Sequence, residues 1–256
     1  MIWDQYTSEQ IAALDRNTPV LLPMAATEQH GPHLPLATDR LIGEYFACQL
    51  NTLINEQVLI LPIVSIGCST HHMDFPGTLS ISHQTFSHQV RDIVNSVIHH
   101  GFHKIILFNS HGGNQGIGQV LTEQLGYQYP KADIVMATWW RIATNDLEKI
   151  TETGFGGVGH ACEFETSLMM LIAPHLVVKE NIKPGSSNST FSWAEGDMLR
   201  GAKATYYRSI KEMTSNGVFG DPSTASLEKG KLITDAVLTV LKQIVIDLAV
   251  SKKKIL

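Results

Sequence analysis

Cysteine is scarce in this sequence, and no other composition signal is extreme. Cys48, Cys68 and Cys162 are the cysteines among 256 residues, and no two of them form a CxxC pair. An odd, sparse set indicates reduced thiols, and we expect a cytoplasmic location. The amino-terminal Met-Ile-Trp-Asp-Gln-Tyr lacks the basic and apolar regions of a signal peptide. No apolar run approaches the ~20 residues of a membrane span, so no membrane association is expected.

A surplus of positive charge is also missing. Lys and Arg number 19 against 24 Asp and Glu, giving a formal net charge of −5. Bulk charge therefore favours neither nucleic acid nor an anionic membrane surface as a partner. Hydrophobic residues make up 43% of the chain, enough for a full core, and the length suits a single domain spanning residues 1–256. Histidine is unusually frequent, with 12 residues, several beside glycines and carboxylates. That distribution is typical of metal sites.

Strand-like apolar runs alternate with helix-like amphipathic segments along the chain. We predict strands at residues 19–26, 58–64, 104–109 and 133–139, and helices at 39–50, 83–100, 164–172 and 227–251. This alternation indicates βαβ units, and so an α/β fold whose mostly parallel sheet is covered by helices on both faces. Residues 183–221 are irregular and rich in Gly, Ser and Asn. We expect this segment to be a lid, an oligomer contact or a surface excursion.

Histidines and carboxylates follow the predicted strands at their carboxyl ends, which is where open α/β sheets bind ligands. They are Glu28 and His30 after the first strand, Asp39 at the next helix start, His111 after the third strand, and His160, Glu163 and Glu165 beyond the fourth. Each of these residues alone has an ordinary structural explanation, such as a loop hydrogen bond or a helix-start charge. Their shared placement is what predicts a site.

The residue types suit a divalent cation. Glu28 and His30 are two positions apart, so in an extended segment both side chains point to the same side. Asp39 carries a short carboxylate that can bridge two metals, and zinc- or manganese-type ions accept mixed imidazole and carboxylate ligands. The remaining histidines of the clusters at 71–72 and 99–103 are expected at the surface or behind the ligands.

Four stretches resemble the signatures of the creatininase (creatinine amidohydrolase) family. The longest runs from Pro23 to Asp39, PMAATEQHGPHLPLATD. The others are FPGT at 75–78, NSHGGN at 109–114 and GHACEFETS at 159–167. The resemblance extends over residues 15–175 and is weaker beyond them.

The resemblance implies an α/β/α sandwich with two divalent metal ions, Zn, Mn or Fe, in each chain. Carried over by motif, the implied metal ligands are Glu28, His30, Asp39 as the bridge, His111 and Glu165, and the implied catalytic residues are His160, for proton transfer, and Glu163, which orients it or acts as a base. Glu163 is an alternative to Glu165 as the last ligand. The resemblance also implies a homo-oligomer, often a hexamer.

Two departures argue against creatinine as the substrate. Creatininases have a glutamate ligand two residues after the strand-end histidine, where this chain has Gly113. The tryptophan expected near the catalytic histidine is replaced by Phe155-Gly-Gly-Val-Gly. The Gly-Gly-Asn pattern is closer to the wider family, which includes formamide hydrolases and peptide-trimming enzymes.

The expected function is a hydrolase acting on carbon–nitrogen bonds other than peptide bonds. Its substrate would be a small molecule with a cyclic amide or formamide-type bond, attacked by water activated between two metals. A serine hydrolase is disfavoured because the sequence has no GxSxG motif. Two alternatives stay open. One is a two-metal phosphoesterase, although Arg40 is the only basic residue close in sequence to the ligands; the other is a non-catalytic metal-binding scaffold.

Overall fold

Four parallel strands form the centre of the protein. The computed structural model describes residues 1–55, 57–185 and 188–251. The strands are β1 (Val20–Met24), β2 (Leu59–Ile60), β3 (Lys104–Asn109) and β4 (Asp133–Thr138), in the spatial order β2-β1-β3-β4. Every residue of β1 and β3 is buried. This explains why both strands read as continuous apolar runs in the sequence instead of alternating polar and apolar residues.

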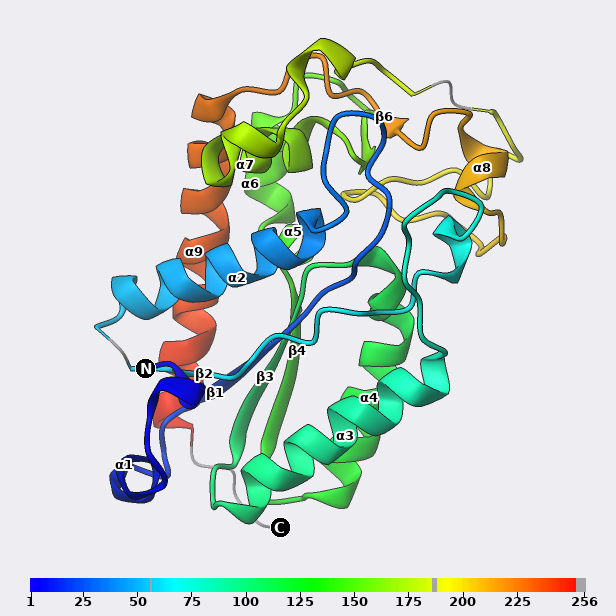
Figure 1. Ribbon diagram of the computed structural model, residues 1–256. Coiled ribbons are helices and arrows are strands. Elements are labelled where there is room, and N and C mark those ends of the chain that lie inside the picture. Colours follow the sequence, from blue (N-terminus) through cyan, green and yellow to red (C-terminus); the bar gives the residue numbers. More distant parts are fainter. Residues whose placement is uncertain (56, 186–187, 252–256) are drawn as a thin grey trace.

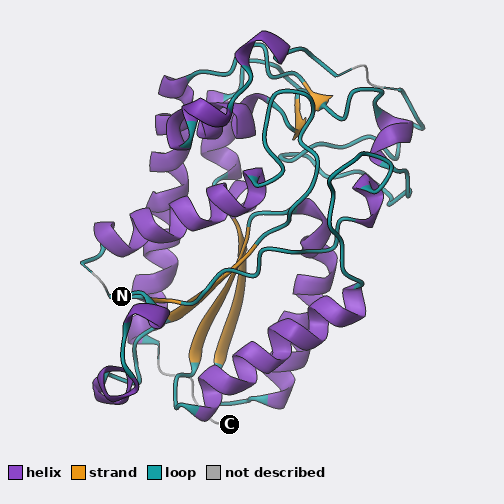
Figure 2. Ribbon diagram, viewed as in Figure 1, coloured by secondary structure: helices purple, strands orange, loops and turns teal. Residues whose placement is uncertain are grey.

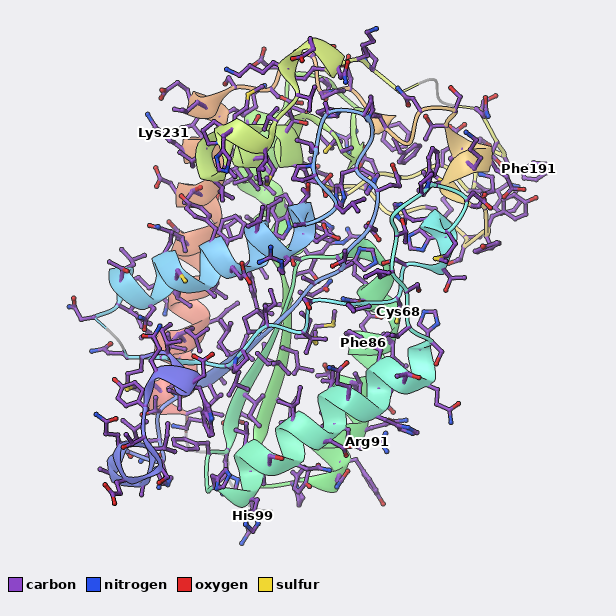
Figure 3. All side chains as sticks on the ribbon, in the orientation of Figure 1. Cys68, Phe86, Arg91, His99, Phe191 and Lys231 are labelled. Atoms are coloured by element: carbon purple, nitrogen blue, oxygen red, sulfur yellow. The ribbon has the colours of Figure 1, made fainter. Side chains whose placement is uncertain are left out.

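Helices cover both faces of this sheet (Figures 1 and 2). One layer contains α2 (Thr38–Leu53), α5 (Trp139–Ile142), α6 (Thr144–Ile150), α7 (Glu163–Ile172) and α9 (Leu227–Val250), and the other contains α3 (His83–His99) and α4 (Gln115–Gln128), with the short α1 (Ser8–Ala13) near the amino end. Successive residues of a strand point to opposite faces. Leu21 accordingly joins the core beneath α2 and α9, whereas Leu22 joins the core beneath α3. Phe86 of α3 is fully buried in that second core (Figure 3). The predicted α/β/α sandwich is confirmed.

The second strand is shorter than the seven residues predicted for it. Leu61 donates its backbone N–H to Leu21, and Val64 donates to Pro23, so the chain keeps following β1 beyond Ile60. Pro62 lies between these two bonds and has no N–H to donate. The ladder is therefore interrupted at the proline, and the regular strand ends before it.

The loops after the strands gather with a small antiparallel pair above the carboxyl edge of the sheet (Figure 1). This pair consists of β5 (Val158–His160) and β6 (Phe219–Gly220). Residues 183–221 are largely irregular, as expected, and their described part contains the short helix α8 (Ile210–Met213) and β6. Phe191 of this segment lies at the periphery of the molecule (Figure 3), stacked on Trp193. None of the described helices combines the length and apolar character needed to cross a membrane.

Candidate metal centre

Polar side chains from five separate elements meet above the carboxyl ends of β1 and β3. Glu28 and His30 follow β1, Asp39 lies in the first turn of α2, and His111 follows β3, as the sequence predicted. His160 comes from β5 and Glu165 from the first turn of α7. The structure thus brings together the five predicted ligands and one of the two predicted catalytic residues. Apart from His160, with 12% of its side chain exposed, these residues are at most 3% exposed.

The first group consists of Glu28, Asp39 and His111. The Nδ1 atom of His111 lies 3.3 Å from Glu28 Oε1 and 3.1 Å from Asp39 Oδ2. The opposite ring atom, Nε2, lies 3.1 Å from the carbonyl oxygen of Cys68, which can only accept a hydrogen bond. Nε2 therefore carries a hydrogen, and the Nδ1 lone pair is free to bind a cation between the two carboxylates.

The second group forms around His30 and shares Asp39 with the first. His30 Nε2 lies 3.3 Å from Asp39 Oδ1 and 3.9 Å from Glu165 Oε1. Its Nδ1 lies 3.1 Å from the carbonyl oxygen of Glu28, so Nδ1 carries a hydrogen and Nε2 is the ring atom that faces the carboxylates. Glu165 Oε2 accepts the backbone N–H of Ala161 at 2.5 Å, which leaves Oε1 facing the group. The two oxygens of Asp39 thus point at histidines that follow two different strands, β1 and β3.

A buried glutamine orients two further histidines, and the sequence analysis did not single it out. Gln29 Nε2 donates to His72 Nδ1 at 2.9 Å, so the hydrogen on His72 is at Nε2, 3.2 Å from Glu28 Oε1. The carbonyl oxygen of Gln29 accepts a bond of 2.7 Å from His160 Nε2, which leaves His160 Nδ1 facing Glu28 at 3.7 Å. Gly217 makes room for this glutamine: a Cβ there would lie 2.1 Å from Gln29 Oε1.

Sequence patterns indicate Gln29 and His72 only weakly. Alternation along an extended segment directed attention to positions 28 and 30 and away from Gln29 between them. His72 was expected at the surface or behind the ligands, and it lies in the second of these positions, 2% exposed and donating to Glu28. The signal that could have found both is their position inside, or three residues before, the motif stretches at 23–39 and 75–78.

Three atoms at the centre of the cluster are buried and have no hydrogen-bond partner among the described residues. They are Glu28 Oε2, His30 Nε2 and Asp39 Oδ2. Buried polar atoms in folded proteins are nearly always paired, because leaving one unpaired costs the desolvation energy without compensation. Two carboxylate oxygens and one imidazole lone pair converging in this way are the donor set that a divalent ion accepts, so the residues present fit a metal.

The charges of the cluster shift the proton affinities of its members. Burial by itself would lower the pKa of His30, but the charge and hydrogen bond of Asp39, together with the charges of Glu165 and Glu28, outweigh burial and raise it to about 9. Burial raises the pKa of Glu165 to about 7. For His160, burial and the nearby positive charge of His30 lower the pKa to about 3. In the absence of metal, the ionised carboxylates of Glu28 and Asp39 therefore lie beside a protonated His30, whereas His160 is neutral at physiological pH.

Glu163 belongs to none of the groups of potential metal ligands found in the described chain, which are Glu28, His72 and His160; His30, His160 and Glu165; and Glu28, Asp39 and His111. Its carboxylate contacts the ammonium group of Lys229 and accepts hydrogen bonds from Thr151 Oγ1 at 2.8 Å and Thr153 Oγ1 at 2.6 Å. The backbone N–H of Glu152 donates to it as well, at 3.0 Å. Lys229 is 5% exposed, so this is a buried ion pair between α7 and α9. The bonds of Glu163 to residues 151–153 hold the segment that precedes β5 against α7.

A cavity of about 250 Å³ opens onto the cluster. Glu28, Asp39, His111, His160 and Glu165 form its floor, and its walls include Gln115, Trp140, Arg141, Met198, Ile210 and Phe219.

Position 113, where creatininases have a glutamate ligand, cannot supply a metal ligand in this chain. A Cβ on Gly113 would lie 2.0 Å from the carbonyl oxygen of Cys68 and 2.5 Å from His111 Nε2. With this backbone, the carboxylate beside His30 comes from Glu165 instead.

The fold and the cluster define the class: an α/β/α sandwich with buried histidines and carboxylates grouped at the carboxyl edge of a parallel sheet. The family model described as creatininase (creatinine amidohydrolase) matches residues 4–245. The chain belongs to the creatininase family, and it is a hydrolase that acts on carbon–nitrogen bonds.

Proteins with different named activities are similar to this chain in sequence. A mycofactocin precursor peptide peptidase of Mycobacterium tuberculosis is 28% identical over 240 residues, which cover 91% of this chain and 85% of that protein. The creatinine amidohydrolase of Pseudomonas putida is 26% identical over 251 residues, covering 92% of this chain and 90% of that protein. A solved structure from Bacteroides fragilis, described as a creatinine amidohydrolase, superposes with a TM-score of 0.83 at 25% identity, covering 100% of this chain and 98% of that one.

Solved creatininases with the same fold include a Mn form and a variant of Zn–Zn type, at TM-scores of 0.78 and 0.77.

Proposed function

We propose that this chain binds two divalent metal ions at the cluster and hydrolyses a carbon–nitrogen amide bond in a small molecule. The single observation that carries the proposal is the orientation of Asp39, whose two oxygens face His111 at 3.1 Å and His30 at 3.3 Å. A carboxylate held in this way can bridge two ions. Glu28 and His111 would complete the first site, and Glu165 and His30 would complete the second.

Mixed carboxylate and imidazole ligands suit Zn, Mn or Fe. The chemistry that such ions supply when bound is a lowered pKa of water and polarisation of a carbonyl group. The forms of creatininase with Mn and with Zn support this choice of ions.

His160 is proposed to move the proton. Its Nε2–H donates to the backbone carbonyl oxygen of Gln29, which fixes the orientation of the ring. Nδ1 is then the ring atom proposed to carry the proton. Because its pKa is lowered to about 3, Nδ1 is unprotonated at neutral pH, and it would accept the proton of the attacking water before donating it to the leaving nitrogen. The 12% exposure of His160 and its place in the lining of the cavity give a substrate access to it.

The expected catalytic part of Glu163 stays a prediction. Its contacts with Lys229, Thr151 and Thr153 favour an indirect contribution, in which Glu163 positions the segment before β5 and so the ring of His160.

The organisation of the whole protein also remains at the level of proposal. We infer a single domain, supported by the family match over residues 4–245. A homo-oligomer, hexameric by resemblance, and a cytoplasmic location remain predictions. The exposed aromatic side chains Phe191, Trp193 and Tyr206 are consistent with the proposed role of residues 183–221 as a lid or an oligomer contact.

A panel of substrates tests the proposed reaction. The purified protein, loaded with Zn or Mn, would be assayed against cyclic amides, formamides and short peptides beside phosphate esters of similar size. Turnover of an amide that disappears on chelation supports the proposal. Turnover of phosphate esters alone would instead establish the two-metal phosphoesterase, and metal binding with no turnover would establish a scaffold.

A further inference from the structure

One arginine lies on the wall of the cavity above the cluster. Arg141 belongs to α5, which begins directly after β4, so the carboxyl end of that strand delivers it to the ligand-binding edge of the sheet. It lines the same cavity as Glu28, Asp39 and Glu165, and its sequence neighbour Trp140 lines it too. The sequence analysis considered only Arg40 as a basic residue near the cluster. The side chain of Arg40 is instead paired with Glu44, at 2.8 Å.

No carboxylate in the described part of the chain lies within 4.0 Å of the Arg141 guanidinium. The guanidinium donates a long hydrogen bond of 3.5 Å, from Nη1 to the carbonyl oxygen of Leu199. Asp197 lines the same cavity, but its oxygens are already occupied. They accept backbone N–H bonds from Gly156 at 2.8 Å, from Leu199 at 3.0 Å and from Arg200 at 2.7 Å.

Such a guanidinium is ready to bind an anion that enters the cavity. Its planar fork of N–H donors matches the two oxygens of a carboxylate or a phosphate. Arg141 is exposed to solvent, and Trp140 and Phe219 add apolar surface to the same cavity. The carboxylates of the floor face the histidines and are proposed as metal ligands, so they do not neutralise Arg141.

We propose that the substrate carries an anionic group, a carboxylate or a phosphate, and that Arg141 binds it while the amide lies on the cluster. Arg141 is then the residue that selects anionic amides over neutral ones. This inference rests on the proposed function, because the amide end of the substrate must be held by the metal centre.

Matched hydroxamic acids test the inference without knowledge of the natural substrate. The hydroxamate group chelates the metals, and a tail of varied length ends in a carboxylate, a phosphonate or a neutral carboxamide. Dissociation constants would be measured by calorimetry on the metal-loaded full chain. We expect the better of the two anionic tails to bind roughly 10-fold more tightly than the carboxamide of equal length. The tighter-binding of the two anionic tails shows whether the site prefers a carboxylate or a phosphate.

The decisive quantity is the ratio of anionic to neutral affinity in variants. Arg141→Gln should reduce the ratio to about one, and Arg141→Lys should restore part of it. Arg200→Gln is the matched control, because Arg200 is 62% exposed, pairs with Glu148 and does not line the cavity. That variant should retain the ratio of the wild type.

Two results would overturn the inference in distinguishable ways. If the neutral hydroxamates bind and Arg141→Gln leaves the ratio of anionic to neutral affinity unchanged, Arg141 does not bind the anionic group. The proposed metal centre is supported in that case. If no hydroxamate of the series binds the metal-loaded protein, the metal centre fails and the inference fails with it.

Discussion

Asp39→Asn removes one charge from the centre of the cluster and nearly nothing else, since the two side chains have the same shape. The lost carboxylate lies 3.3 Å from His30 and 3.1 Å from His111. With an effective dielectric constant of about 20, a unit charge at such a distance contributes roughly 5 kcal/mol. An ion in either proposed site loses an electrostatic attraction of this size. The amide oxygen of the asparagine and water restore part of it. We expect a net loss of about 4 kcal/mol, on the order of a thousandfold in affinity.

The assay is the metal content of each chain, determined by elemental analysis after dialysis against a weak chelator. The wild type should retain two ions, and Asp39→Asn should lose both, because Asp39 is the one side chain common to the two groups around His30 and His111. Thermal unfolding with and without added metal provides a second measurement. The stabilisation by metal seen for the wild type should be absent from the variant, since only ligands that bind the folded state stabilise it.

Glu44→Gln is the matched control for this experiment. Glu44 lies on the same helix as Asp39, is 38% exposed and pairs with Arg40, so the change of charge is the same but the cluster is untouched. Equal metal content in Asp39→Asn and Glu44→Gln would refute the bridging role of Asp39. Loss of only one ion would show that Asp39 serves a single site.

Three further predictions concern proton transfer, the buried ion pair and metal loading. His160→Ala should lower turnover by roughly 100- to 10,000-fold with metal content near normal; equal loss of metal would make His160 a ligand instead. Glu163→Gln leaves the exposed Glu152, at 2.9 Å, as the remaining carboxylate partner of the buried Lys229. The change should cost about 2 kcal/mol in urea unfolding, part of it recovered by adding Lys229→Met, and an unchanged midpoint would contradict this. Burial would raise the pKa of Glu163, but Lys229 and the threonine hydroxyls lower it below 4.5. This stabilisation is therefore present above pH 4.5 and lost as the pH falls through the lowered pKa, a loss that Glu163→Gln should not show. Finally, His30, with its pKa raised to about 9, is protonated at pH 7 and must release that proton to bind metal. Calorimetry in buffers of different ionisation enthalpy should detect proton release on loading, and affinity should rise with pH; no proton release would argue against His30 as a ligand.

The sequence by itself determined the layered fold and most of the cluster. Continuous apolar runs predicted strands buried on both faces, and β1 and β3 are buried throughout. The carboxyl ends of parallel strands meet at one edge, so residues that directly follow strands could be placed together without coordinates. Glu28, His30 and His111 follow this rule because each is within six residues of a strand end.

Only the tertiary structure decided which of two glutamates in one helical turn faces the cluster. Glu163 and Glu165 are two positions apart on α7, so a helix turns their side chains to different sides. Glu165 lies 3.9 Å from His30, whereas Glu163 pairs with Lys229, which is 66 residues further along the chain. The bonds from Gln29 to His72 and His160 and the position of Arg141 likewise join segments that are far apart in sequence. Local periodicity carries no record of such long-range contacts, because the packing of whole helices and loops against the sheet sets them.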